Sequence, residues 1–277
     1  MFSEQHLLRN ARTELYGGEL VRPHESPERA QMVLERVRAV GLGPITAPSR
    51  FGLAPVLRAH DEQFVEFLRN AWADWVAAGN RARRFRTVGR PDAWRNVVQM
   101  GLPGDWVITR WLARHRSAPE RGRPRVPRLT WRFPERPFLG TARVPRLRYV
   151  ALHGDPSEAF PYFSGFADEA GADAGEGYNI NFPLPRATGF GLWQQTLATA
   201  LACIRRYSPD ALVVSLGVNT FVRDPISFFR LESSDFSTYG GMIGACRIPT
   251  LFVFEGGYAV ADVGVNVVNV LAGFEDV

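Results

Sequence analysis

Short apolar runs alternate with amphipathic segments in the second half of the chain. This alternation limits the folds that the chain can adopt more than any other feature of the sequence. Runs typical of buried parallel strands lie at positions 148–153, 211–216 and 250–254. Apolar residues recur at helical spacing over 193–204 and again over 263–271. Strands alternating with helices predict a layered α/β domain with a parallel sheet, whose ligands bind beyond the carboxyl ends of the strands.

Two further helices are expected in the first 80 residues. Ser26 is a favourable N-cap and Pro27 suits the first helical position, so a helix is predicted to start there and to end at Gly41. A second helix is expected over residues 60–78, where aromatic and aliphatic residues share one face. These two helices carry core positions and no chemistry of their own.

The central segment, residues 81–147, follows neither the helical nor the strand period. The 33 basic residues of the chain are all arginine, and 18 of them lie between Arg81 and Arg148 against four acidic residues. The remainder of the chain has an excess of acidic residues. We therefore expect one domain in three parts: residues 1–80, the aberrant Arg- and Pro-rich residues 81–147, and residues 148–277.

Composition also bears on location and on partners. No apolar run approaches the roughly 18 residues that a membrane span needs, and the start of the chain lacks a secretory leader, so we expect a cytoplasmic protein without membrane contact. Cys203 and Cys246 are too few for a disulfide framework or a four-thiolate zinc site. Clustered arginines leave a nucleic-acid-binding module as an alternative, which the absence of lysine and of a recognisable binding fold disfavours.

Distinctive motifs lie on both sides of the central segment. They are Leu8–Leu20, His153-Gly154-Asp155-Pro156, Ser215-Leu216-Gly217-Val218-Asn219-Thr220-Phe221, Asp224–Phe229 and Glu255-Gly256-Gly257-Tyr258. In these segments the chain resembles the acetylpolyamine amidohydrolases of the histone deacetylase superfamily. The resemblance implies a three-layer α/β/α arginase-deacetylase fold with a parallel sheet, and hydrolysis of a small acetylated amine to acetate and free amine. It also implies a zinc cofactor and a homodimer.

The resemblance assigns roles to three residues of a candidate site. Tyr258 matches the tyrosine that donates to the developing oxyanion, although a lone Gly-Gly-Tyr is more often a structural turn. Phe160 matches an aromatic wall of the substrate channel, and by itself would be read as a core residue. Glu14 matches a carboxylate that recognises the distal amine cation, with a solvated surface residue as the alternative.

The sequence departs from the family at the metal site. Asn219 stands where the family has the second aspartate ligand, and an amide lacks the charge that offsets desolvation of a divalent metal. The family's Pro-Gly-His-His and Asp-Val-Asp-x-His-His-Gly-Asn-Gly motifs, which supply the catalytic histidines and the other two ligands, are not found. The five histidines are His6, His24, His60, His115 and His153, and no two are adjacent.

Both missing motifs would fall in the central segment, which also looks shorter than the family's spacing requires. GC-rich codons for residues 117–124, read two bases out of frame, can give Arg-Ala-Gly-Thr-Trp-Ala-Ala, close to the family's Ala-Gly-Thr-Trp-Glu-Ala-Ala. The segment is therefore interpreted as an out-of-frame reading, with deletion, that disrupts the central portion of the fold and exposes apolar sheet faces. The predicted function is that of a deacetylase-family amidohydrolase, and we expect this sequence to be inactive because the metal ligands and the histidine pair are missing. The alternatives are a non-catalytic pseudoenzyme and a frameshifted gene product.

Overall fold

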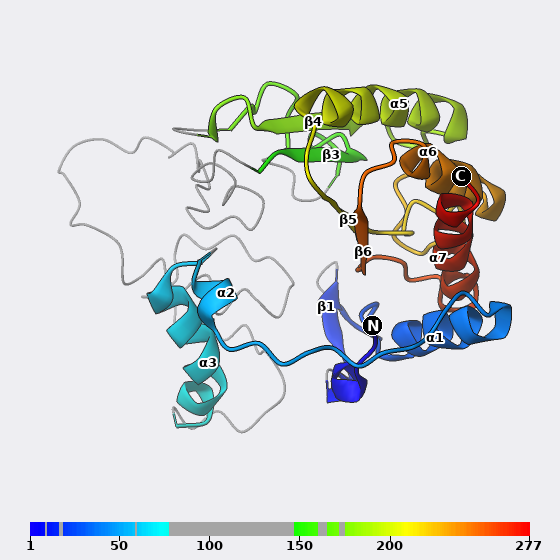
Figure 1. The fold of residues 1–277 in the computed structure, drawn as a ribbon. Helices are drawn as coiled ribbons and strands as arrows, with labels where there is room; N and C mark the ends of the chain where they lie inside the picture. The colour runs from blue at the N-terminus through cyan, green and yellow to red at the C-terminus, as the bar shows by residue number, and fades with distance from the viewer. Residues whose placement is uncertain (9, 17–18, 59, 78–146, 160–164, 172–174) are drawn as a thin grey trace. The chain divides into compact units, whose positions relative to one another are not determined.

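The computed structural model describes the chain except for residues 9, 17–18, 59, 78–146, 160–164 and 172–174 (Figure 1). The Arg- and Pro-rich segment thus lies outside the described residues, apart from Leu147. The chain divides into two compact units: residues 1–9, 25–48 and 131–277 form the first, and residues 10–24 and 49–130 form the second. Each unit is described by itself.

The described residues of the second unit form a hairpin and two helices. Strand β1 (Glu14–Tyr16) pairs antiparallel with β2 (Glu19–Val21), and helix α2 (Ala54–Leu57) precedes α3 (Glu62–Ala77). The Asp61 carboxylate accepts the backbone amides of Gln63 at 2.9 Å and Phe64 at 3.3 Å, which caps the start of α3. The helix expected over residues 60–78 is therefore confirmed, with its first turn starting two residues later.

In the part of the first unit that the structure describes, the strands form two parallel pairs. Strand β3 (Tyr149–Gly154) pairs with β4 (Asn179–Leu184), and β5 (Leu212–Leu216) pairs with β6 (Thr250–Phe254). Among the described residues no strand joins the two pairs by hydrogen bonds. The parallel strands expected from the sequence are confirmed, and they form two short sheets.

Helices accompany both strand pairs. The 3-10 helix η1 (Glu4–Leu8) and α1 (Glu28–Val40) come first, followed later by α5 (Phe190–Tyr207), α6 (Ser233–Gly244) and α7 (Val260–Glu275). Helix α5 runs alongside the β3–β4 pair, and α6 and α7 lie on one side of β5 and β6 (Figure 1). None of the described helices has the length and hydropathy to span a membrane.

Helix α1 ends as its sequence predicts and begins slightly later. Gly41 adopts a left-handed φ of 68°, and its amide donates to the carbonyl of Arg38, which closes the last turn. Pro27, rather than Ser26, occupies the N-cap position, and no side chain caps the helix. The prediction of Ser26 as N-cap was wrong by one residue, a difference typical of helix ends that lack a side-chain cap.

The core of the first unit lies between β5–β6 and the helices. Most of its fully buried side chains come from the segment after β5, from α6 and from α7, and include Phe221, Leu231, Phe236, Val263 and Val270. Partly buried residues of β5 and β6, such as Val214 and Phe252, pack against this cluster. The core thereby covers the inward face of the β5–β6 pair. It also includes residues of the segment that follows β5, such as Phe221.

Helices α6 and α7 approach each other backbone to backbone through glycines. A Cβ on Gly240 of α6 would overlap the carbonyl oxygen of Val270, and a Cβ on Gly273 of α7 would overlap that of Ser237. A Cβ on Gly244 would come within 2.6 Å of the carbonyl oxygen of Phe274. Only glycine allows this separation, which explains the Gly-rich sequence of α6.

The outward face of the β5–β6 pair is exposed and apolar. Val213 and Leu251 are directly opposite in the register and are 64% and 50% exposed, and Val253 next to them is 40% exposed. Parallel strands are normally covered on both faces, so this face is an apolar patch open to association. That the central segment causes this exposure stays a prediction, because nearly all of that segment lies outside the described residues.

We expect this patch to limit solubility. The double substitution Val213→Thr/Leu251→Thr keeps β-branched or strand-compatible side chains while reducing apolar area. It should lower concentration-dependent light scattering by about threefold or more. Leu192→Gln, at an exposed position of α5, serves as the control and should change scattering little. Equal scattering for the double variant and the parent would show that the patch does not drive association.

Candidate functional site

The loop between β6 and α7 carries Tyr258 and turns sharply at a glycine. Gly257 has a φ of 128°, and a Cβ at this position would come within 2.5 Å of a methyl group of Val218. A side chain is therefore excluded at 257 for both conformational and steric reasons. The turn brings Tyr258 beside the segment that follows β5.

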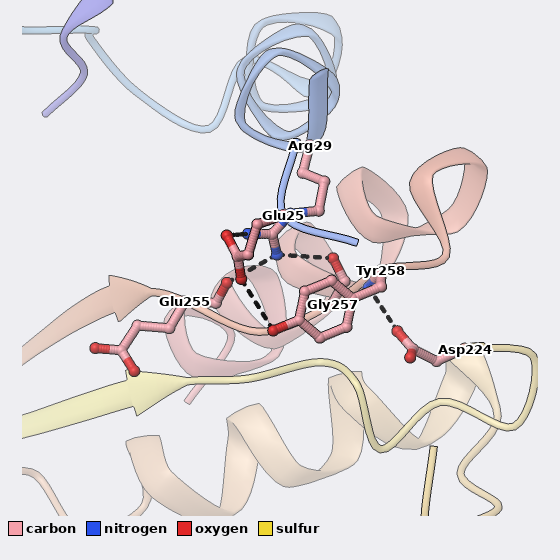
Figure 2. Close-up of polar contacts among 6 residues, drawn as sticks. All are labelled: Glu25, Arg29, Asp224, Glu255, Gly257 and Tyr258. Atoms are coloured by element: carbon pink, nitrogen blue, oxygen red, sulfur yellow. Dashed lines mark hydrogen bonds and ion pairs between the residues drawn. The ribbon is translucent and has the colours of Figure 1, made fainter. Parts of the chain in front are cut away.

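Asp224 holds the backbone of this tyrosine loop. Its Oδ2 accepts the amides of Tyr258 at 2.6 Å and Ala259 at 3.2 Å, while Oδ1 accepts the amide of Ile226 at 3.1 Å. The residue is only 6% exposed, so these three donors replace water around a buried carboxylate. Asp224 thus fixes where the Tyr258 ring leaves the backbone (Figure 2).

Arg29 of α1 binds the same loop from the opposite side. Its Nη1 donates to the carbonyl oxygens of Glu255 and Gly257, both at 2.9 Å. The guanidinium carbon lies 4.7 Å from the centroid of the Tyr258 ring, within the range of a cation–π contact. The Arg29 side chain is 7% exposed, and it joins the first helix to the loop after the last strand.

Glu25 links Arg29 to the phenol of Tyr258. Arg29 Nη2 donates to Glu25 Oε2 at 2.6 Å, and the Tyr258 hydroxyl donates to Glu25 Oε1 at 3.0 Å (Figure 2). Burial of the ring, followed by the charge of Glu25 and its hydrogen bond, raises the pKa of Tyr258 to about 12. The phenol is therefore a protonated donor at neutral pH.

Asn219 lies close to the tyrosine loop. It follows β5, and its side-chain oxygen would be 2.9 Å from a Cβ on Gly217 and 3.0 Å from a Cβ on Gly256. The two glycines therefore leave the space that the amide fills. The structure thus brings Asn219 against the same loop that presents Tyr258.

The described residues around Asn219 do not make up a set of zinc ligands. Structural and catalytic zinc sites use three or four thiolate, imidazole or carboxylate ligands. Among the residues that the structure describes, no group of three or more His, Cys, Asp or Glu side chains could hold a metal. His153 lies on β3 with its Nδ1 3.0 Å from the carbonyl oxygen of Gly154, and its ring packs against Gly165.

The side chains of the two other residues expected in the site, Glu14 and Phe160, are not described by the structure. Glu14 is the first residue of β1 in the second unit, and its side chain is not among those described. Phe160 lies outside the described residues. Their roles in substrate binding remain predictions, as does the role of Tyr258 in donating to an oxyanion.

Sequence reasoning missed Glu25, Arg29 and Asp224 as parts of the site. Glu25 and Arg29 are four residues apart at a helix start, a spacing that allows an ion pair, but by itself this segment indicates only the start of a helix. Asp224 stands in a motif that assigns it no role. Their contacts with the tyrosine loop depend on tertiary structure that local spacing does not show.

Comparison with known proteins identifies close relatives. A profile of the histone deacetylase domain matches residues 140–274. Acetylpolyamine amidohydrolase 2 of Pseudomonas aeruginosa is 37% identical over 342 aligned positions, covering 100% of this chain and 98% of the relative. An acetylpolyamine amidohydrolase of Mycoplana ramosa is 36% identical, covering 99% of this chain and 98% of the relative. The 342 aligned positions exceed the 277 residues of the chain, so some positions of the first relative have no counterpart here.

Solved structures agree on the fold. A crystal structure of acetylpolyamine aminohydrolase from Burkholderia pseudomallei superposes with a TM-score of 0.71 at 26% identity, covering 99% of this chain and 97% of that one. The expected arginase-deacetylase fold is therefore confirmed. With relatives above 30% identity along nearly their whole length, the chain belongs to the acetylpolyamine amidohydrolase family of the histone deacetylase superfamily.

Proposed function

We propose that this chain is a non-hydrolysing member of its family, which retains the tyrosine loop for contact with an acetylated amine and lacks a metal site. The observation that carries the proposal is Asn219, a neutral amide against the tyrosine loop, in a sequence that has no two adjacent histidines. The names of the relatives indicate acetylated polyamines as the ligand class. In this proposal the chain binds the acetylated amine but does not cleave it.

The chemistry of amide hydrolysis supports this assignment. Hydrolysis requires an activated water in addition to a donor that stabilises the oxyanion. The hydroxyl of Tyr258 can donate a hydrogen bond to a carbonyl oxygen. A phenol with a pKa of about 12 stays protonated at neutral pH, so it cannot act as the base that activates water. The sequence has no adjacent histidines to serve as a base pair. A hydrogen bond from Tyr258 without a base to activate water favours binding of the acetamide without its cleavage.

We expect no acetate release when the chain is incubated with N-acetylputrescine and added zinc chloride. Acetate should not exceed the amount formed with zinc alone, and Tyr258→Phe should leave that amount unchanged. Calorimetric titration of the same ligand should show binding that Tyr258→Phe weakens by at most about 10-fold, because the phenol gives up its hydrogen bond to Glu25 when it donates to the ligand. Acetate release that scales with protein and disappears in Tyr258→Phe would contradict the proposal.

The other expectations keep the status of predictions. Binding of nucleic acid would depend on residues 81–147, nearly all of which lie outside the described residues. Zinc as a resident cofactor, a homodimer and a cytoplasmic location are expectations from the resemblance and the composition. The homodimer and the cytoplasmic location are compatible with the proposal but do not support it, whereas a resident zinc ion would contradict it.

A further inference from the structure

Glu25 has both carboxylate oxygens committed to the site. Oε2 accepts from Arg29 at 2.6 Å, and Oε1 accepts from the hydroxyl of Tyr258 at 3.0 Å. Figure 2 shows the Glu25 side chain directed at the phenol from the segment before α1, while Asp224 approaches the loop from the other side. The residue is therefore placed to act on the tyrosine side chain itself, whereas Asp224 acts on its backbone.

A phenol has a single proton to donate. In the described structure this proton is directed at Glu25, so the hydroxyl can donate to a second acceptor only if its bond to Glu25 lengthens or breaks. The bond is charge-assisted, which makes it stronger than one to a neutral carbonyl oxygen. A ligand carbonyl that accepts from Tyr258 must therefore compete with Glu25.

The charges that face the phenol act in opposite directions. The carboxylates of Glu25 and Asp224 favour the protonated phenol, whereas the guanidinium of Arg29 favours the phenolate. Glu25 has the larger effect because it also accepts the hydroxyl proton directly. Glu25 is also the carboxylate partner of Arg29. Without the Glu25 charge, the positive charge of Arg29 would favour the phenolate with less opposition.

We propose that Glu25 is the positioning residue of Tyr258: it holds the phenol by its only proton in the ligand-free chain, and a ligand oxygen must displace it to be bound. The consequence for ligand binding rests on the proposed function, but the hold of Glu25 on the phenol does not. Glu25 thereby sets the affinity of the tyrosine for neutral acceptors. No covalent step is involved, and the proton stays on the phenol oxygen throughout.

The test is a pH titration of the phenol in the full chain. Position 258 is replaced by 3,5-difluorotyrosine, whose phenol ionises at lower pH, and ionisation is followed by fluorine NMR. Glu25→Gln should lower the midpoint by about one pH unit or more, because the carboxylate no longer opposes the phenolate. Glu35→Gln removes an equal charge at an exposed position of α1 and should leave the midpoint unchanged.

A second variant keeps the proposal falsifiable if Glu25→Gln does not fold. Glu25→Asp retains the charge with a shorter reach, and it should lower the midpoint by less than Glu25→Gln. An unchanged midpoint in every folded Glu25 variant would overturn the proposal. These measurements use no ligand, so their failure is distinct from failure of the proposed function, which would appear as an absence of N-acetylputrescine binding in the parent chain.

Discussion

A chimera that regains the family's central segment should become a hydrolase. In this chimera residues 81–147 are replaced by the corresponding segment of the Pseudomonas aeruginosa relative, and Asn219→Asp is added. We expect it to bind about one zinc ion per chain and to release acetate from N-acetylputrescine at least about 1,000-fold faster than the parent chain. The reason is that the resemblance places the missing ligands and the histidine pair in that segment, while position 219 supplies the remaining carboxylate. Zinc content is measured by elemental analysis after dialysis.

The matched control is the same chimera with Asn219 retained. An amide in place of one carboxylate ligand should reduce acetate release by at least about 100-fold, because ligand charge offsets the desolvation of the metal. The parent chain with Asn219→Asp alone should remain inactive, since one carboxylate does not make a metal site. Equal activity of the chimeras with and without Asn219→Asp would show that this position does not bind the metal.

Alanine at the glycine contacts between α6 and α7 should cause a large loss of stability. In Gly273→Ala the new methyl group would overlap the carbonyl oxygen of Ser237, which belongs to a helix backbone and cannot rotate away. The two helices must then separate and lose core contacts, so the free energy of unfolding should fall by about 3 kcal/mol. Urea unfolding followed by circular dichroism measures this change.

Gly191→Ala on α5 provides the control for helix propensity. Apart from its chain neighbours and the backbone of its own helix, no atom lies within 4 Å of a Cβ at this position, and its φ does not lie in the left-handed region. The substitution should be neutral or stabilise the chain by up to about 1 kcal/mol, because alanine favours helix more than glycine does. If Gly273→Ala and Gly191→Ala changed stability equally, the close approach of α6 and α7 would not be what requires glycine.

The elements found from sequence are those with a clear period or a clear stop signal. The runs at 211–216 and 250–254 became β5 and β6, and Gly41 ended α1 as expected. Helix α6 was missed because its sequence is rich in serine and glycine, which local propensity disfavours in a helix. Its glycines are required by contact with α7, a tertiary constraint that no local pattern contains.

The candidate site was predictable only where a motif carried it. Tyr258 and Asn219 were found from the sequence motifs, and the structure places their two loops in contact through Gly256. Glu25 and Arg29 were not found because their partners lie more than 220 residues later in the chain. Their importance follows from which groups share a buried space, and spacing along the sequence does not reveal this.

The bond between Arg29 and the tyrosine loop also has a consequence for how the chain folds. Arg29 donates to the carbonyl of Glu255 across 226 residues, so the first helix and the last loop form one unit only late in synthesis. Contacts between such distant segments slow folding, because the chain loses loop entropy before the contact stabilises it. During translation, Arg29 of α1 therefore lacks its partners in the tyrosine loop until the C-terminal residues leave the ribosome. The geometry of the tyrosine is among the last features of this protein to be established.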